Sequence, residues 1–206
     1  MLKIKYFFQQ SWLLIVASFL FGLLIATANA AWQERILKNE EEKFNNLARQ
    51  MLPDANDFET AVENIEVDTG KGKKKLTSVK KALAADGKCI GWAFKCEGSG
   101  FADKIKLVLA VDAGFEQLKG FGVLSSNETP GFGDQIKLPY YRNQFVDIPA
   151  EELILSKIGD AGKKDAEIIA ISRATVSSRA VVDIVNNFLP QVKDQIVTKG
   201  LIGNDG

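Results

Sequence analysis

The sequence predicts an α+β protein, in which one N-terminal transmembrane helix precedes a domain with an antiparallel sheet and packed helices. Three features of the chain predict this class. Residues 11–28 form an uncharged apolar run, short apolar segments separated by turn residues occupy residues 89–124, and apolar residues recur at helical spacing from Val181 to Val192. Once the apolar run is set aside, the 206-residue chain has roughly the length of one ordinary domain.

The N-terminal run, Ser11–Ala28, carries no charged residue and is near the lower length limit for a helix that crosses a bilayer. Lys3 and Lys5 precede it, so the positive-inside rule predicts a cytoplasmic N-terminus. We therefore expect residues 1–32 to be a single-pass anchor in the cell inner membrane. Residues 33–206 are then expected to form one periplasmic, or otherwise extracytoplasmic, domain.

A cleaved signal peptide is the alternative reading of the same run. Ala28–Asn29–Ala30 fits the small-x-small pattern of a cleavage site. The apolar run is longer than the usual core of a signal peptide, and this length favours an uncleaved anchor.

Composition excludes several classes of function. The chain has 26 basic and 26 acidic residues, and this balance gives no support to nucleic-acid binding. It has no histidine, which excludes Ser-His-Asp and Cys-His catalysis and removes the commonest transition-metal ligand. We therefore expect no catalytic residue and no metal site. Electron transfer by this chain would require a bound cofactor.

The two cysteines, Cys89 and Cys96, do not have CxxC spacing. In an extended strand they would be separated by roughly 23 Å, which is too far for a disulfide. We expect two packing cysteines, and a disulfide only if the chain turns between them.

Between the apolar run and the strands, two segments have distinct patterns. Gln33–Leu52 is charged and periodic, which predicts an amphipathic helix that ends before Pro53. Thr69–Lys81 carries six lysines, which predicts a solvated loop or, alternatively, a docking patch for an acidic partner.

Strand patterns begin at residue 88. Cys89–Phe94 alternates around aromatic residues, Ile105–Val111 is a nearly continuous apolar run, and Leu118–Leu124 follows a turn at Asp112–Gly114. These segments predict an antiparallel meander. Glycines inside the strand patterns indicate bulges or close approach of another chain segment; they are Gly91, Gly120 and Gly122.

Two polar segments contain the candidate site residues. In Asn127–Asp134, the dipeptide Pro130–Gly131 predicts a tight turn. Ile171–Arg179 holds four hydroxyl side chains between a short predicted strand, Ile168–Ile171, and the final helix. A helix start attracts phosphate because its first N–H groups lack partners within the helix. Alternatively, Ser177 or Ser178 only caps the helix.

Both segments resemble motifs of one family. Ser172–Arg173–Ala174–Thr175 resembles the Ser-Gly-Ala-Thr motif of the membrane-anchored FMN-binding subunits of Rnf and sodium-pumping NADH:quinone oxidoreductase complexes. Glu128–Gly133 is similar to the Glu-Thr-Pro-Gly-Leu-Gly signature of that family, with Phe132 in the Leu position. Gly91–Phe94 and Asn143–Phe145 add two weaker matches, so the resemblance covers residues 87–189. The chain length favours the G subunit of the Rnf complex.

The resemblance implies a cofactor and a site in the domain over residues 33–206. FMN would be attached through a phosphoester to Thr175, with Ser172 and Ala174 completing the motif. The flavin ring would lie against the second segment, where Glu128 and Thr129 would bond its polar edge and Gly131 and Gly133 would let the backbone approach it.

The resemblance also implies partners. The subunit would relay electrons in an Rnf-type complex that couples ferredoxin and NAD redox chemistry to ion translocation. The other membrane subunits of that complex, and a flavin transferase that matures the protein, would be its partners.

Two positions depart from the family pattern. Arg173 replaces the usual Gly, and Ile169 replaces an acidic residue three positions before the Ser. If residue 173 has a positive φ, Arg173 is strained by about 1–2 kcal/mol. If φ is negative there, its guanidinium is placed to pair with the FMN phosphate. A structural subunit without covalent flavin, and an anchored sensor domain, are the alternative functions.

Overall fold

The computed structural model describes residues 2–68 and 74–202, with side chains from residue 11 onward. The chain divides into two compact units, Met1–Glu42 and Lys43–Gly206. The boundary falls inside the first helix, α1 (Leu2–Met51), which is continuous over 50 residues. The predicted helix over residues 33–52 is therefore the continuation of the apolar helix, and it ends just before Pro53, as expected.

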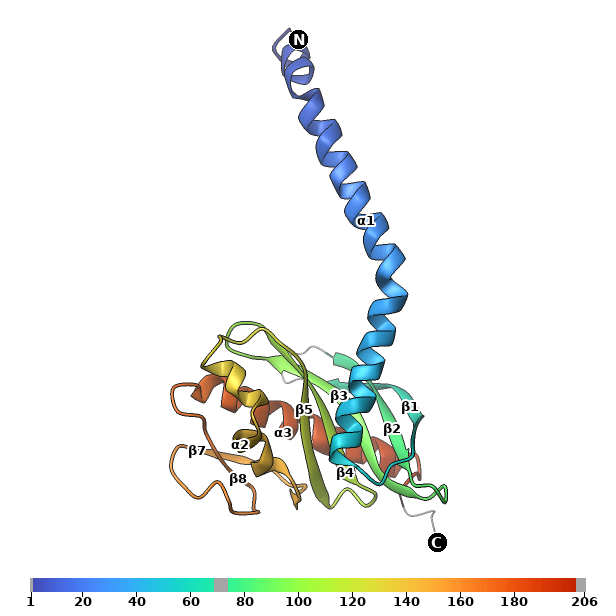
Figure 1. The fold of residues 1–206 in the computed structure, drawn as a ribbon, viewed down its shortest axis with the longest axis vertical. Coiled ribbons are helices and arrows are strands. Elements are labelled where there is room, and N and C mark those ends of the chain that lie inside the picture. The colour runs from blue at the N-terminus through green and yellow to red at the C-terminus, as the bar shows by residue number, and fades with distance from the viewer. Residues whose placement is uncertain (1, 69–73, 203–206) are drawn as a thin grey trace. The chain divides into compact units, whose positions relative to one another are not determined.

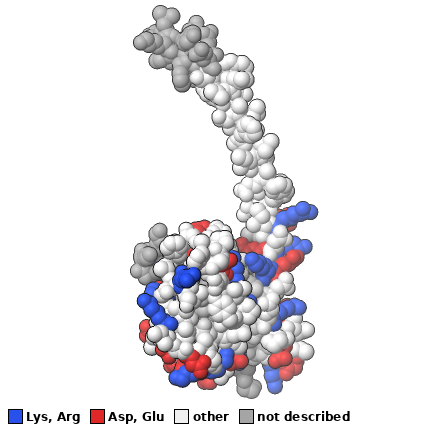
Figure 2. Space-filling model, turned by 60° about the vertical axis from the view of Figure 1, so that its left-hand side comes forward, with Lys and Arg blue, Asp and Glu red and all other residues white. Residues whose placement is uncertain are grey.

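The first unit contains the apolar part of α1 and the charged residues that follow it, up to Glu42. Side chains between Trp12 and Ile25 are exposed around the whole helix, and no charged residue occurs from Ser11 to Gln33. Figure 2 shows this stretch of α1 without basic or acidic side chains. A helix that exposes apolar residues on all sides is stable in a bilayer rather than in water. Its length and apolar composition are those of a membrane-spanning segment, as predicted.

The second unit is built on a six-stranded antiparallel sheet whose strands follow in chain order (Figure 1). The strands are β1 (Asp57–Asp68), β2 (Lys74–Leu83), β3 (Cys89–Ser99), β4 (Lys104–Asp112), β5 (Gln117–Ser126) and β6 (Ile148–Pro149). The meander predicted over residues 89–124 is confirmed as β3, β4 and β5.

Short elements connect β5 to the last helix. They are the 3-10 helices η1 (Gly133–Lys137) and η2 (Asn143–Phe145), the helix α2 (Pro139–Arg142), and a parallel pair of strands, β7 (Ile154–Ser156) and β8 (Glu167–Ile169). The final helix, α3, spans Thr175–Thr198. The strand predicted at residues 168–171 is β8, and it ends two residues earlier than expected.

Helices cover both faces of the sheet, so β4 is buried on both sides. Alternate residues of β4, such as Leu107 and Leu109, belong to the core that contains α3. Val108 and Ala110 belong to a second core that contains Phe44 and other residues from the end of α1. Burial on both faces explains why β4 is a continuous apolar run rather than an alternating one.

The glycine positions within β5 match the expected close approach. A Cβ added at Gly122 would lie 2.8 Å from Leu47 Cδ2, because the last turns of α1 pack directly on this strand. Gly120 has φ +129°, and the register of β4 and β5 shifts nearby, between Ala110 and Val111. Because glycine has no side chain, β5 accommodates both the close approach of α1 and a bulge in its pairing with β4.

The predicted lysine loop is wrong for residues 74–81, which form most of β2. Lys71 and Lys73 lie outside the described residues. Lys80 is buried: its Nζ lies 5.1 Å from the centroid of the Phe44 ring and donates to Asn45 Oδ1 at 3.2 Å. Long lysine stems bury along apolar surface while the ammonium group finds a polar partner, so a lysine-rich segment can still be a strand.

Candidate functional site

The loop that follows β5 contains the predicted Pro-Gly turn. The N–H of Phe132 donates to the carbonyl of Thr129 at 3.2 Å, and Gly131 has φ +75°. Proline at the first central position and a positive φ at the second are the features of a type II turn. Gly131 is therefore required by the backbone, and the predicted turn is confirmed.

A second turn of the same kind precedes α3. The N–H of Ala174 donates to the carbonyl of Ile171 at 3.0 Å, and Arg173 has φ +66°. Arg173 thus occupies the position that Gly131 occupies in the first turn, in a backbone conformation that favours glycine. Of the two outcomes expected at residue 173, the structure has the strained one, at a cost of about 1–2 kcal/mol.

The helix α3 begins immediately after this turn. Thr175 is its first residue and is half-buried, Ala174 is the N-cap residue, and no described side chain caps the helix. The prediction that Ser177 or Ser178 caps the helix is wrong. Ser178 Oγ instead donates to the carbonyl of Ala174 at 3.0 Å and accepts from the N–H of Ile171 at 3.0 Å. The first turn of α3 therefore keeps the positive dipole end that favours a phosphate.

A buried carboxylate connects the two turns. Ser177 Oγ donates to Glu128 Oε2 at 2.5 Å, across 49 residues of sequence. Glu128 Oε1 accepts from the N–H groups of Phe101 and Ala102, at 2.9 and 3.1 Å. Glu128 is 4% exposed. This one side chain therefore links the Pro-Gly loop, the β3–β4 turn and the first turn of α3.

Gly133 makes this junction possible. A Cβ added there would lie 2.5 Å from Ser177 Oγ and 2.6 Å from Glu128 Oε2. Distances this short leave no room for a side chain, so the glycine is required by packing rather than by φ.

The structure thus brings the two predicted motifs together. Within each motif, some residues are exposed and others are buried. Thr129 and Gly131 are exposed at the tip of the Pro-Gly loop, whereas Glu128 and Gly133 are buried at its base. In the other motif Ser172 is exposed and Ala174 is buried. Both oxygens of the Glu128 carboxylate have protein donors, so within residues 128–133 the exposed polar side chain is that of Thr129.

Sequence reasoning missed several residues that position this site. Gln144, in η2, accepts from the N–H of Ile169 at 2.7 Å and donates to its carbonyl at 3.2 Å, which holds β8 just before the second turn. The hydroxyl of Tyr141 donates to the carbonyl of Ser178 at 3.0 Å, and burial raises the pKa of this phenol. The short Asn143–Phe145 match was the only signal for the role of Gln144, and Ser177 was considered only as a possible helix cap.

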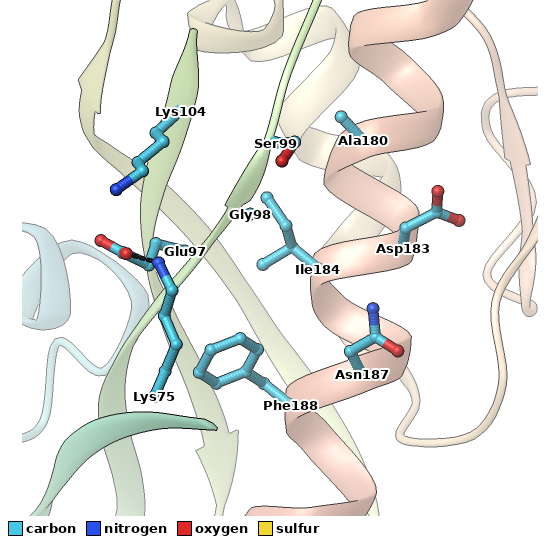
Figure 3. A pocket seen from close by; sticks show the side chains of 10 residues that line it. All are labelled: Lys75, Glu97, Gly98, Ser99, Lys104, Ala180, Asp183, Ile184, Asn187 and Phe188. Atoms are coloured by element: carbon cyan, nitrogen blue, oxygen red, sulfur yellow. Dashed lines mark ion pairs between the residues drawn. The ribbon is translucent and has the colours of Figure 1, made fainter. Parts of the chain in front are cut away.

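A groove of about 250 Å³ lies beside α3 and contains none of the predicted site residues. Figure 3 shows Lys75 and Glu97 paired on the sheet side, opposite Ile184 and Phe188 of α3. The backbone at Gly98 packs against Ile184, because an added Cβ would lie 2.4 Å from Ile184 Cγ1. The groove is therefore a packing seam between β3 and α3, separate from the junction of the two turns.

The two cysteines lie in β3 and no disulfide joins them, as expected. Cys96 is 3% exposed, and burial raises the pKa of its thiol well above the usual range. A neutral, enclosed thiol is a packing group rather than a redox group.

The chain is similar to known FMN-binding proteins. The FMN-binding domain family matches residues 100–190, which include both turns and most of α3. The G subunit of the ion-translocating oxidoreductase complex of Methanosarcina acetivorans is 30% identical over 182 residues, which cover 88% of this chain and 92% of that protein. The G subunit of the Na(+)-translocating ferredoxin:NAD(+) oxidoreductase complex of Acetobacterium woodii is 28% identical over 188 residues, covering 88% of this chain and 89% of that protein.

Solved structures match the fold. NqrC of Shewanella oneidensis superposes with a TM-score of 0.54 at 21% identity, over 71% of this chain and 73% of that one. The C subunit of the Na(+)-translocating NADH-quinone reductase of Parabacteroides distasonis gives 0.54 at 18% identity, over 77% and 95%. The predicted class, an apolar helix followed by an antiparallel sheet with packed helices, is confirmed.

Proposed function

The chain belongs to the family of G subunits of ion-translocating oxidoreductase complexes, and on this premise we propose that it relays electrons through FMN attached to Thr175. Family membership makes it a membrane-associated flavoprotein subunit with an FMN-binding domain. The flavin would supply the redox chemistry. The chain has no histidine, and its described residues contain no cluster of metal ligands. The protein binds and orients the group.

The residues at the start of α3 fit a phosphoester. Thr175 Oγ1 would bond to the phosphorus of FMN. A flavin transferase would take the FMN group from a donor molecule in which the FMN phosphate is part of a phosphoric anhydride. The anhydride P–O bond would break, the leaving group would take its electron pair, and the threonine proton would pass to solvent. The positive end of the α3 dipole, uncapped by any described side chain, stabilises the phosphate. Ser172 and Ala174 shape the turn that presents Thr175.

The observation that carries the proposal is the bond between Ser177 and Glu128. It fixes the Pro-Gly loop beside the first turn of α3, so a group held at Thr175 lies within reach of that loop. The flavin ring would rest against residues 128–133, with Thr129 bonding its edge and the backbone of Gly131 close to its face. Exposed side chains at this end, including Phe101 and Phe132, leave the ring accessible to partners.

The same proposal includes topology and partners. Residues 1–32 would be a single-pass anchor in the inner membrane, with the N-terminus in the cytoplasm. Residues 33–206 would form the periplasmic or extracytoplasmic FMN domain. Its partners would be the other membrane subunits of an Rnf-type complex that couples ferredoxin and NAD redox chemistry to ion movement.

One observation favours a second function. Arg173 has a left-handed φ where the family motif has Gly, so the turn is strained and an exposed charged side chain is added to the motif that a flavin transferase must recognise. The alternative is therefore a structural subunit that assembles the complex without covalent flavin.

The two functions are separated by expressing the full chain with a flavin transferase. The wild type and the Arg173→Gly variant are compared by flavin fluorescence on a denaturing gel and by intact mass. A gain of FMN less one water on the wild type supports the electron carrier. A wild-type chain that gains no flavin, with Arg173→Gly labelled, supports the structural subunit, and two unlabelled chains overturn the proposed attachment.

A further inference from the structure

A second groove, of about 240 Å³, is lined by residues of β5, α2 and η2 and by the last residues of α1; we call it the α2 groove. Arg142, in α2, lines it, and its Nε donates to the carbonyl of Phe121 at 3.0 Å. This is the one hydrogen bond that Arg142 makes with the described residues, although a guanidinium group carries five N–H donors. The terminal N–H groups of Arg142 can therefore bond a group that enters the groove.

No described acidic residue lines the α2 groove, whose polar lining residues are Gln50, Lys119, Arg142 and Asn143. Lys119 is already paired, because its Nζ lies 2.9 Å from Asp147 Oδ1. Arg142 is half-buried and forms no ion pair with a described residue, and burial lowers the pKa of its guanidinium. A partly buried charge without a partner is unfavourable, so the groove favours an anionic group from outside the chain.

The short helix α2 and its N-cap residue also expose apolar side chains beside the α2 groove. Pro139 lines the groove and is exposed, and its neighbours Leu138 and Tyr140 are 45% and 52% exposed. The Tyr140 hydroxyl donates to Gln135 Oε1, which holds this exposed ring in place. A fixed aromatic ring next to an arginine is typical of the anchors of a protein interface, whereas a small diffusing anion has no use for these apolar side chains.

We propose that Leu138, Tyr140 and Arg142 form a docking surface for an acidic segment of another subunit of the same complex, with an aspartate or glutamate of that segment paired to Arg142. The planar guanidinium matches a carboxylate in a bidentate pair. The inference rests on the proposed place of this chain in a complex of membrane subunits, and not on the attachment of flavin to Thr175. The α2 groove contains none of the predicted site residues, so this contact leaves the junction of the two turns accessible.

The first test identifies the partner carboxylate in the intact complex. Arg142→Lys places an amine at the groove, and a carbodiimide joins an amine to a carboxylate only when the two are in contact. Complexes that carry this variant or Arg49→Lys are purified in mild detergent and treated, and the linked peptides are identified by mass spectrometry. Arg49 is the matched control, because it is exposed, does not line the groove and also donates to a backbone carbonyl, that of Asn56 at 3.3 Å.

We expect Arg142→Lys, and not Arg49→Lys, to be linked to an aspartate or glutamate of another subunit. The absence of a link from Arg142→Lys to another subunit overturns the proposal. The same link from Arg49→Lys also overturns it.

The second test measures the strength of the contact. The affinity of the full-length chain for the complex that lacks it is measured for the wild type, Arg142→Gln and Arg49→Gln. We expect Arg142→Gln to bind about 30-fold or more weakly, because it leaves the partner carboxylate unpaired, and Arg49→Gln to bind as the wild type does. An unchanged affinity in Arg142→Gln, or an equal loss in Arg49→Gln, contradicts the proposal.

A change in the partner alone separates lost contact from lost folding. Replacing the linked carboxylate by its amide leaves this chain intact, and it should weaken binding of the wild type as much as Arg142→Gln does. The two changes together should cost little more than either one. Full additivity would refute a direct pair.

Failure of the proposed function has a different signature. The subunits that accompany the wild-type chain, and its covalent FMN, are measured by mass before either test. A chain that assembles without using Arg142 overturns the docking surface alone. A wild-type chain that joins no other membrane subunit overturns the proposed function, and the docking surface with it.

Discussion

Ser177 Oγ lies 2.5 Å from Glu128 Oε2, and this hydrogen bond joins the two segments that carry the family motifs. Both residues are at most 4% exposed, and Gly133 packs against both. The loop that follows β5 and the first turn of α3 therefore form one unit.

Replacing either partner is expected to destabilise the domain. Ser177→Ala leaves Glu128 Oε2 buried without a donor, at a cost of about 1–3 kcal/mol in the free energy of unfolding. A double-mutant cycle of Ser177→Ala and Glu128→Gln, measured by urea unfolding, should give a coupling of about 0.5–3 kcal/mol. Strictly additive effects would contradict a direct bond.

Arg173→Gly is expected to stabilise the flavin-free domain against unfolding. The left-handed φ costs an arginine about 1–2 kcal/mol, while glycine gains freedom in the unfolded chain, so the net gain is about 0.5–1 kcal/mol. Arg179→Gly is the matched control, because Arg179 is exposed within α3 and its replacement should cost about 1 kcal/mol. Urea unfolding of both variants tests the opposite signs; destabilisation by Arg173→Gly would refute the strained turn.

The seam between β3 and α3 is expected to tolerate no added methyl group. Gly98→Ala places a Cβ 2.4 Å from Ile184 Cγ1, so the Ile184 side chain or α3 must shift, at a cost of about 1–3 kcal/mol. Gly114→Ala is the control, because its nearest neighbour, Glu116 Cγ, is 3.5 Å away. Thermal unfolding should show a lower Tm only for Gly98→Ala; equal Tm values would mean that the seam is looser than described.

The thiol of Cys96 is expected to resist alkylation in the folded domain. Burial raises its pKa, so the reactive thiolate is suppressed at neutral pH, and the side chain is enclosed as well. Iodoacetamide labelling followed by peptide mass analysis should modify Cys96 only after unfolding, whereas Cys89 is half-buried and should react earlier. Rapid native labelling of Cys96 would contradict the packing of β3.

The sequence was a good guide where one local pattern decided the structure. The uncharged run predicted the apolar part of α1, and the strands from Cys89 to Leu124 follow their apolar patterns. The strand β1 was missed because two register shifts in its pairing with β2 interrupt the alternation of its buried residues. The strand β2 was missed because its lysines indicated a solvated segment, although Lys80 is buried against Phe44.

The arrangement of the site residues could not be predicted from the sequence alone, because it depends on the fold. Family motifs identified Thr175 and the Pro-Gly loop, but no spacing showed that Ser177 would meet Glu128 across 49 residues. The φ of Arg173 was left open by the sequence, because an arginine adopts a positive φ only when the surrounding turn imposes it.

The most direct test of the central claim is covalent flavin on Thr175→Ala. The full chain is expressed with a flavin transferase, separated on a denaturing gel, imaged for flavin fluorescence and weighed intact. Thr198→Ala is the control, because Thr198 is the exposed threonine at the other end of α3. The account predicts that the wild type and Thr198→Ala gain FMN less one water, and that Thr175→Ala gains nothing while its circular dichroism is unchanged. Flavin retained on denatured Thr175→Ala would contradict the account.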